Sequence, residues 1–258
     1  MSAPATTPVR AVLVGVTGRM GHALVRAAAD FPALRISGAI AAPGSAALGQ
    51  DTGTLAGCAP TNLRVSAELG RSLADSDVVI DFSRPEALPA TLAACRGARR
   101  ALLIGTTGWS SAQEEALTAA AADIPLLVAA NTSLAVAVLT ELTRRAAELL
   151  PPDFAISVSE RHHAGKRDSP SGTARALAAA AESGRAGAPV PVHSVREGEF
   201  VGEHDVLFSG PGESLTLAHR ALDRSLFARG ALSAALWLAS QPPGRYTMRD
   251  FLDGKTGT

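Results

Sequence analysis

The chain has 258 residues, of which 47% are hydrophobic, and it carries 24 basic and 24 acidic side chains. That length can bury one large core or two modest ones, and a formal net charge of zero excludes the strong basic field typical of nucleic-acid-binding or membrane-surface proteins. There is no apolar run of membrane-spanning length, no apolar signal segment, and no cysteine framework or metal-binding cysteine spacing, so a soluble cytoplasmic protein is expected.

Short apolar runs alternate with helical patterns over the first half of the chain. Strands are expected at 9–14, 34–40, 78–82, 101–104 and 126–129. Helices are expected between them, at 19–31, 85–95 and 111–122, whereas 42–70 has the composition of loops with one strand near 63–66. This alternation is typical of a parallel sheet covered on both faces. The first domain is therefore predicted to be a Rossmann-like α/β domain.

The pattern changes after residue 134, where strands begin to follow one another. Helices are expected at 134–150, 173–182 and 225–238. Strands are expected at 155–159, 190–196, 205–209 and 214–219. Strands in direct succession favour a mixed or antiparallel sheet, so the second domain is predicted to be α+β.

The segment VLVGVTGRMG places Gly15, Gly18 and Gly21 between the first strand and the first helix. Glycine permits a tight turn and a close backbone approach to a pyrophosphate, which the start of the following helix attracts. The spacing G-x-x-G-x-x-G departs from the usual G-x-G-x-x-G, so an ordinary strand–helix turn is the alternative. Arg19 favours the binding site, because a guanidinium can hydrogen-bond two phosphate oxygens at once.

Small polar loops follow three later strands, with the sequences DFSRPE, GTTG and AANTS at 81–86, 105–108 and 129–133. Each alone is also typical of a generic turn. Because the carboxyl ends of parallel strands meet at one edge of the sheet, we expect these loops and the glycine loop to line one cleft.

The segment ERHHAGKRDSPSGTA (160–174) has the residue types of a proton-transfer site. His162 and His163 can titrate near neutral pH, and Lys166 is one of only two lysines among the 24 basic residues. Lysine, unlike arginine, can give up a proton, so Lys166 is expected to be a proton donor or a compact cation for a carboxylate, with Asp168 able to orient it. The alternatives are a solvated lysine and structural histidines; a metal site is disfavoured, because no other ligand cluster accompanies them.

A helix start follows directly. Ser171 or Thr173 could cap this helix, and Gly172 between them could let its N-terminus hold a carboxylate. An anionic substrate that undergoes proton transfer, next to a nicotinamide-binding fold, indicates the reduction of a polarised C=C or C=N bond.

These motifs resemble those of the dihydrodipicolinate reductase family over nearly the whole chain, most specifically in 160–174. The resemblance implies reduction of 4-hydroxy-tetrahydrodipicolinate, a small dicarboxylate, with NADPH and/or NADH in lysine and diaminopimelate biosynthesis. It implies a dinucleotide-binding domain (1–133), a substrate-binding and tetramerisation domain (134–233) and a C-terminal segment (234–258) that returns to the first domain. The assembly implied is a homotetramer.

The resemblance also implies roles for particular residues. His162 is expected to be the catalytic acid/base and Lys166 the proton donor, with no metal. The dicarboxylate is expected to bind at His163, Gly172 and Thr173, with Ser171 beside them. Cofactor binding is expected from Gly15, Val16, Thr17, Gly18, Arg19, Met20, Arg84, Gly105, Thr106, Thr107, Ala129, Ala130, Asn131 and Thr132.

Two departures from the family pattern concern the cofactor. Thr17 replaces the middle glycine of the first loop, and Ala41 stands where many members carry an acidic residue for the ribose hydroxyls of NADH. The choice between NADH and NADPH therefore stays open. Two other functions compete: another two-domain NAD(P)-dependent dehydrogenase of an aspartate-derived metabolite, which would not explain the His/Lys cluster, and a catalytically silent nucleotide sensor, in which that cluster should have decayed.

Overall fold

The computed structural model describes residues 7–187 and 189–256, and the chain divides into two compact units. Unit 1 extends to Thr132 and resumes at Phe227, and unit 2 is Ser133–Leu226. The boundary expected at 233 falls inside helix α8 (Ser225–Leu238), and the chain instead changes unit within the first turn of that helix. In the described ranges, no helix has both the length and the apolar character needed to cross a bilayer.

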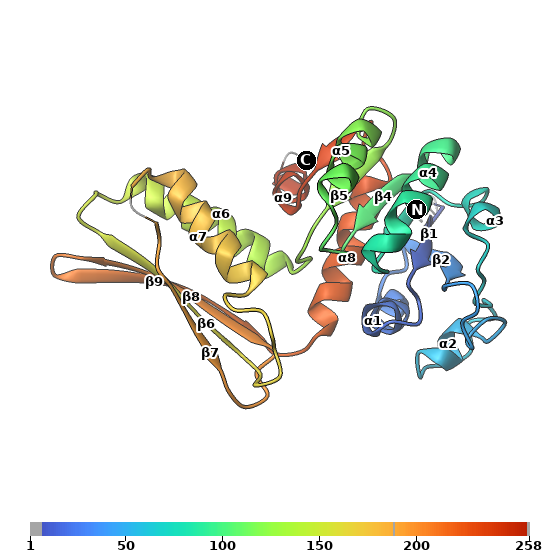
Figure 1. Ribbon diagram of the computed structural model, residues 1–258, viewed down its shortest axis with the longest axis horizontal. Helices are drawn as coiled ribbons and strands as arrows, with labels where there is room; N and C mark the ends of the chain where they lie inside the picture. Colours follow the sequence, from blue (N-terminus) through green and yellow to red (C-terminus); the bar gives the residue numbers. More distant parts are fainter. Residues whose placement is uncertain (1–6, 188, 257–258) are drawn as a thin grey trace, which may run out of the picture. The chain divides into compact units, whose positions relative to one another are not determined.

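Unit 1 is built on a six-stranded sheet in the order β10-β5-β4-β3-β1-β2, in which every pairing is parallel (Figure 1). Its strands are β1 (Val9–Val14), β2 (Leu34–Ile40), β3 (Val78–Asp81), β4 (Ala101–Ile104), β5 (Pro125–Val128) and β10 (Gly244–Tyr246). β3 and β4 are buried along their whole length. Their short apolar runs fit a parallel sheet that is covered on both faces, which confirms the Rossmann-like prediction.

Helices cover this sheet. They are α1 (Arg19–Ala27), η1 (Ala28–Asp30), α2 (Thr52–Leu55), α3 (Leu69–Leu73), η2 (Pro85–Ala87), α4 (Leu88–Ala98), α5 (Ser111–Ala120), α8 and α9 (Met248–Thr256). Leu92 of α4 and Leu117 of α5 pack with the strands in one buried cluster. Cys95 belongs to the same cluster and is free, so this cysteine is part of the core.

The segment between β2 and α3 contains more structure than the expected loops. Asp51 caps the single turn of α2 by accepting a hydrogen bond from the Thr54 N–H (2.9 Å). The strand expected near 63–66 is reduced to isolated bridges, of Ser66 with Ile40 and of Arg64 with Asp51. Ser66 therefore pairs with the end of β2, the edge strand of the sheet.

Unit 2 has a four-stranded sheet in the order β7-β6-β8-β9, with two helices packed on it (Figure 1). Its elements are α6 (Leu134–Leu149), β6 (Ala155–His162), α7 (Gly172–Gly184), β7 (Val192–Arg196), β8 (Gly202–Gly210) and β9 (Glu213–Ala221). β6 and β7 are parallel, and the other two pairings are antiparallel. This is the mixed sheet expected from strands in direct succession.

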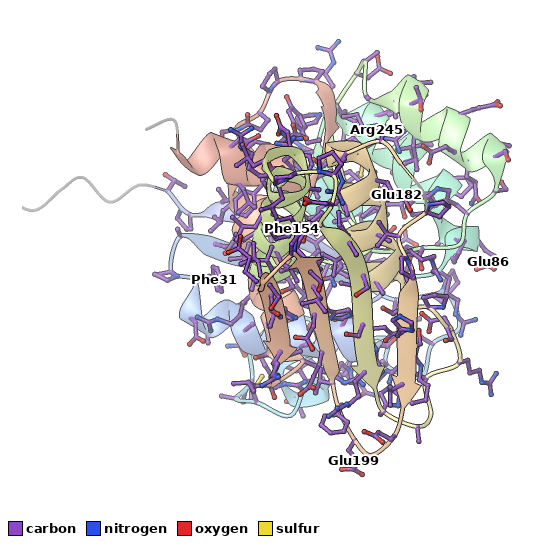
Figure 2. The ribbon with its side chains drawn as sticks, turned by 90° about the vertical axis from the view of Figure 1, so that its left-hand side faces the viewer. Phe31, Glu86, Phe154, Glu182, Glu199 and Arg245 are labelled. Atoms are coloured by element: carbon purple, nitrogen blue, oxygen red, sulfur yellow. The ribbon has the colours of Figure 1, made fainter. Side chains whose placement is uncertain are left out.

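The two faces of this sheet differ. Val158, Val206 and Phe208 are buried in a core that they share with α6 and α7. Within unit 2, the described residues place no helix on the opposite face, where Val195 and Leu207 are 43% and 37% exposed. Figure 2 shows the strands of this sheet, with the turn between β7 and β8 at one end, marked by Glu199.

Candidate functional site

The glycine loop of unit 1 follows β1 and lies against the end of β2. The N–H groups of Gly15 and Val16 both donate to the Ile40 carbonyl, at 3.0 and 3.1 Å. Gly15 has a φ of +82°, and a Cβ at this position would lie 2.8 Å from the carbonyl oxygen of Phe82, which follows β3. Only glycine avoids both the left-handed strain and the clash, so the residue types of this loop fix its path between two strand ends.

The start of α1 also depends on close packing. A Cβ on Gly21 would lie 2.4 Å from the Val16 carbonyl oxygen, so this glycine lets the helix approach the loop. Thr17, which stands where a glycine was expected, has a φ outside the left-handed region. A threonine at this position therefore causes no backbone strain. Thr17, Gly18 and Arg19 are exposed, which leaves the helix start open to an anion.

The other loops of the expected cleft follow β3, β4 and β5. Because the sheet is parallel, these loops lie at the same edge as the glycine loop. Arg84, Thr107 and Ala130 are exposed. The remaining candidates of unit 1 are half-buried or buried: Gly15, Val16, Met20, Gly105, Thr106, Ala129, Asn131 and Thr132.

Two threonines in these loops differ in how their hydroxyls are used. Thr132 is buried and donates to the Phe227 carbonyl at 2.7 Å, so its hydroxyl fastens this loop to the start of α8. The hydroxyl of Thr106 is buried and has no partner among the described residues. Buried polar groups are nearly always hydrogen-bonded, and a polar group of a bound cofactor would satisfy this one.

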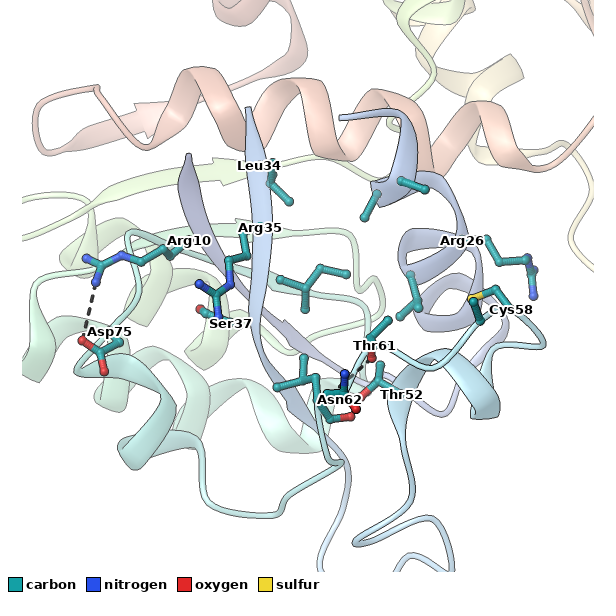
Figure 3. A pocket seen from close by; sticks show the side chains of 16 residues that line it. Arg10, Arg26, Leu34, Arg35, Ser37, Thr52, Cys58, Thr61, Asn62 and Asp75 are labelled. Carbon is teal, nitrogen blue, oxygen red and sulfur yellow. Dashed lines mark hydrogen bonds and ion pairs between the residues drawn. The ribbon is translucent and has the colours of Figure 1, made fainter. Parts of the chain in front are cut away.

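A separate pocket of about 890 Å³ lies beside the amino-terminal half of β2 (Figure 3). Two of its arginines are already engaged, Arg10 with Asp75 at 3.5 Å and Arg26 with the Ala56 carbonyl at 2.8 Å. None of its lining residues belongs to the glycine loop or to the later strand-end loops. This pocket is therefore distinct from the expected cofactor site.

In unit 2, the side chains of Glu160 and His162 meet at the end of β6. They are two residues apart on a strand, so they point to the same face, the one that α7 covers. Nδ1 of His162 is hydrogen-bonded to Oε2 of Glu160, and both residues are buried. β6 ends at His162, so the adjacent His163 is free of the strand's alternation.

Arg196 of β7 completes this cluster. Its Nη1 and Nη2 atoms donate to Oε2 and Oε1 of Glu160, at 2.9 and 2.7 Å. Burial opposes the ionisation of Glu160, but its hydrogen bonds, led by those from Arg196, lower its pKa to about 2. Burial also lowers the pKa of His162, although the hydrogen bond with Glu160 raises it. At neutral pH the pair is therefore an ionised carboxylate beside a neutral imidazole.

His163 and Lys166 belong to the turn that follows β6. The Lys166 N–H donates to the His163 carbonyl at 3.1 Å. Nζ of Lys166 contacts both carboxylate oxygens of Asp168, at 2.7 and 2.8 Å, and this pairing lowers the pKa of Asp168. Asp168 thus orients Lys166 as the sequence suggested. Arg196 donates to the Asp168 carbonyl at 2.6 Å, so one guanidinium contacts both Glu160 and the lysine-bearing turn.

The start of α7 lies beside the same cluster. Ser171 caps the helix by accepting from the Ala174 N–H at 3.1 Å, and the Ser171 N–H donates to Oε1 of Glu160 at 3.2 Å. Gly172 is exposed, and the nearest atom to a Cβ at this position would be the far end of Arg175, 3.9 Å away. Thr173 is half-buried. An open helix start next to His162 is suited to holding a carboxylate.

Sequence analysis alone does not single out three members of this cluster: Glu160, Arg196 and His204. Glu160 could have been found, because it precedes His162 by two residues on a strand. His204 lies on β8 and joins the cluster because the register of the sheet pairs it with Glu160 of β6. The centroid of its ring lies 5.1 Å from that of the His162 ring. Burial lowers the pKa of His204 to about 4, so this ring is neutral at pH 7.

The spacing within this cluster also raises the question of a metal ion. Ligand atoms of Glu160, His162 and His204 lie within 4.8 Å of one another. Both oxygens of Glu160 already accept hydrogen bonds from Arg196, whose charge neutralises the carboxylate. A bound cation would have to displace this guanidinium, so the arrangement favours proton transfer over metal binding.

Comparisons with known proteins agree over both units. The family model described as "Dihydrodipicolinate reductase, N-terminus" matches residues 9–132, and the one described as "Dihydrodipicolinate reductase, C-terminus" matches residues 135–252. A 4-hydroxy-tetrahydrodipicolinate reductase from Anaeromyxobacter dehalogenans is 40% identical and the alignment covers 96% of this chain and 99% of the relative. That of Methylocella silvestris is 43% identical, with 94% and 96% covered.

One solved structure supports the fold. The dipicolinate-bound dihydrodipicolinate reductase from Paenisporosarcina sp. TG-14 is similar with a TM-score of 0.76, over 93% of this chain and 98% of that chain. The two sequences are 22% identical, so this likeness concerns the architecture.

Proposed function

The chain belongs to the dihydrodipicolinate reductase family, and from that premise we propose which of its residues carry out the reaction. It is an NAD(P)H-dependent oxidoreductase that reduces 4-hydroxy-tetrahydrodipicolinate in lysine and diaminopimelate biosynthesis. Another two-domain dehydrogenase is not favoured, because both units match this one family. The two free cysteines and the biosynthetic role support the cytoplasmic location that we propose.

The observation that carries the assignment of roles is the buried pair of Glu160 and His162 next to the turn that bears Lys166. The reduction consumes one hydride and one proton and releases the 4-hydroxyl group as water, so the site must both donate and accept protons. A neutral imidazole can accept a proton and return it. We assign this acid/base role to His162 and the role of proton donor to Lys166.

The residues of unit 1 fit a dinucleotide. The exposed start of α1 suits a pyrophosphate. The glycine loop can keep its path only with glycine at 15 and 21, because a Cβ at either position would clash with a backbone carbonyl oxygen. The buried hydroxyl of Thr106 has no partner among the described residues and could bond to the cofactor. We propose that the loops at the carboxyl edge of the sheet hold NADH or NADPH. When bound, the cofactor supplies the hydride.

The proposed activity can be tested by coupling the protein to the upstream condensation of pyruvate with aspartate semialdehyde. Loss of nicotinamide absorbance should require both precursors and this protein together. Omitting either precursor is the control. Absorbance loss that persists without pyruvate would indicate a different substrate and would contradict the proposal.

Substrate binding at the start of α7 predicts a specific effect of Gly172→Val. The structure has room for the new side chain within the protein, so the fold should persist, but the valine would occupy the space beside the helix N-terminus. We expect the KM for the substrate, and the Kd for the product mimic pyridine-2,6-dicarboxylate, to rise about tenfold, the loss of about 1.4 kcal/mol of binding.

Calorimetric titration with pyridine-2,6-dicarboxylate measures this affinity directly. Gly187→Val, at another glycine with open space around it, is a matched control. Unchanged affinity in Gly172→Val would remove the start of α7 from the binding site.

We propose that the chain assembles as a homotetramer through the uncovered face of the unit 2 sheet. This face carries the partly exposed apolar side chains of Val195 and Leu207 beside the paired charges of Arg161 and Glu203. A mixed apolar and charged sheet face is suited to burial against another copy. Light scattering gives the assembly mass, and Leu207→Glu should reduce it; a monomeric wild type would contradict this assembly.

A further inference from the structure

The carboxylate of Glu160 is fully buried and accepts three hydrogen bonds besides that of His162, two from Arg196 and one from the Ser171 N–H. Its side chain is 0% exposed. Arg196 reaches both oxygens, and the Ser171 N–H reaches Oε1 at 3.2 Å. An ionised carboxylate has no proton to give. The atom of His162 that faces Glu160, Nδ1, must therefore be the one that carries the ring proton when His162 is neutral.

We infer that Glu160, held ionised by Arg196, is a positioning residue that fixes His162 as the Nδ1–H tautomer, so that Nε2 is the atom that exchanges protons. Only the second part of this inference, that Nε2 exchanges protons with the substrate, rests on the proposed function. The tautomer itself follows from hydrogen bonds within unit 2. A carboxylate that orients a histidine in this way commonly fixes both the tautomer and the ring orientation.

The groups that surround His162 are consistent with a single tautomer. Lys166 in the turn and Arg196 on β7 add positive charge near the ring, and both oppose its protonation. His204 on β8 is neutral and packs edge-on against the ring. α7 contributes Ser171, which is not titratable. Glu160 is therefore the one negative group in direct contact with His162 among the described residues.

Arg196 has a second effect on the same site. It donates to the carbonyl of Asp168, whose side chain pairs with Lys166. The same guanidinium thus holds Glu160 and the turn that carries Lys166. Arg196 therefore helps to position both His162 at the end of β6, through Glu160, and Lys166 in the turn, through Asp168.

Glu160→Gln provides a sharp test because the amide has only one acceptor oxygen. Besides His162, two donors point at Oε1, Nη2 of Arg196 and the Ser171 N–H, whereas only Nη1 of Arg196 points at Oε2. The amide oxygen should therefore take the position of Oε1, at the loss of the Nη1 hydrogen bond, and the NH2 group should face Nδ1 of His162. The ring must then accept at Nδ1 and carry its proton on Nε2. Long-range ¹H–¹⁵N spectra of the ¹⁵N-histidine-labelled protein, without substrate, should show Nδ1–H in the wild type and Nε2–H in Glu160→Gln. The signal is assigned with His162→Asn.

Kinetics should change in a way that a purely structural role would not produce. We expect kcat of Glu160→Gln to fall about 10–100-fold, the range typical for residues that orient a reacting group, with KM changed less than threefold. Because Glu160 raises the pKa of His162, its loss should shift the corresponding limb of the pH–kcat profile to lower pH. Glu148→Gln, whose carboxylate pairs with Arg144 and Arg145 on α6, is the matched control and should keep the wild-type tautomer and kcat.

The outcomes separate this inference from the proposed function. An Nε2–H tautomer in the wild type would overturn the inference, whether or not the variant folds. An unchanged tautomer in Glu160→Gln with an equal loss of kcat would reduce Glu160 to a structural role. Failure of the proposed function would instead appear as wild-type protein with the Nδ1–H tautomer and no turnover in the coupled assay.

Discussion

Replacing Lys166 with arginine should lower kcat by about 10²–10⁴-fold, the contribution typical of general acid catalysis. Arginine keeps the positive charge, so an ion pair with Asp168, now 2.7 Å from Nζ, can persist. A guanidinium does not release its proton in the pH range of an enzyme, whereas an ammonium group can. KM should change much less than kcat, since the charge offered to the substrate is retained. Steady-state kinetics in the coupled assay provide both values.

Two further variants separate charge from proton donation at this position. Lys166→Met removes both properties, so we expect it to lose turnover as the arginine variant does and to raise KM as well. Lys255→Arg, at the chain's other lysine, should behave as the wild type. Near-normal turnover of Lys166→Arg would mean that Lys166 is an electrostatic contact only and would remove proton donation from its role.

Local patterns predicted most of the secondary structure because they report which faces are buried. The apolar run before Gly15 is β1, and the amphipathic pattern at 225–238 coincides with α8. In the segment between β2 and α3, the single turn of α2 was not predicted, because its order comes from the cap that Asp51 forms and from isolated bridges, which leave no periodic apolar pattern. The position of the change between units was also not visible, because α8 continues through it.

The residues of the site also fall into two groups, those that local sequence patterns could identify and those that they could not. The candidates in 160–174 come together because they are close in sequence, at a strand end, a turn and a helix start. Glu160 was within reach of sequence reasoning, since strand alternation places it on the same face as His162. Arg196 and His204 were not, because only the pairing of β6 with β7 and β8 brings them to Glu160. Register between strands that are distant in sequence has no local signature in a single sequence.

Cofactor choice should depend on the residues just after β2, because the glycine loop is hydrogen-bonded to Ile40 there. The sequence pointed to Ala41 as the position of the missing acidic residue. Ala41 is 4% exposed and its N–H donates to the Ser66 carbonyl at 2.9 Å, so an acidic side chain at 41 would be buried. Burying an unpaired charge is costly. Ala42 is exposed and is therefore the better position from which a side chain could reach a ribose.

We expect the wild type to use both cofactors, with NADPH at least as effective as NADH, and Ala42→Glu to shift the ratio of kcat/KM values toward NADH by roughly ten- to hundredfold. A carboxylate after the second strand accepts hydrogen bonds from the ribose hydroxyls of NADH and repels a 2′-phosphate, while the exposed Arg19 can pair with that phosphate in the wild type. Each tenfold change corresponds to about 1.4 kcal/mol. Ala42→Gln, which cannot repel the phosphate, should shift the ratio less, and Ala41→Glu should mainly lower Tm. If the wild type prefers NADH by about a hundredfold, or if Ala42→Glu leaves the ratio unchanged, the ribose-binding residues lie elsewhere in the segment 41–47.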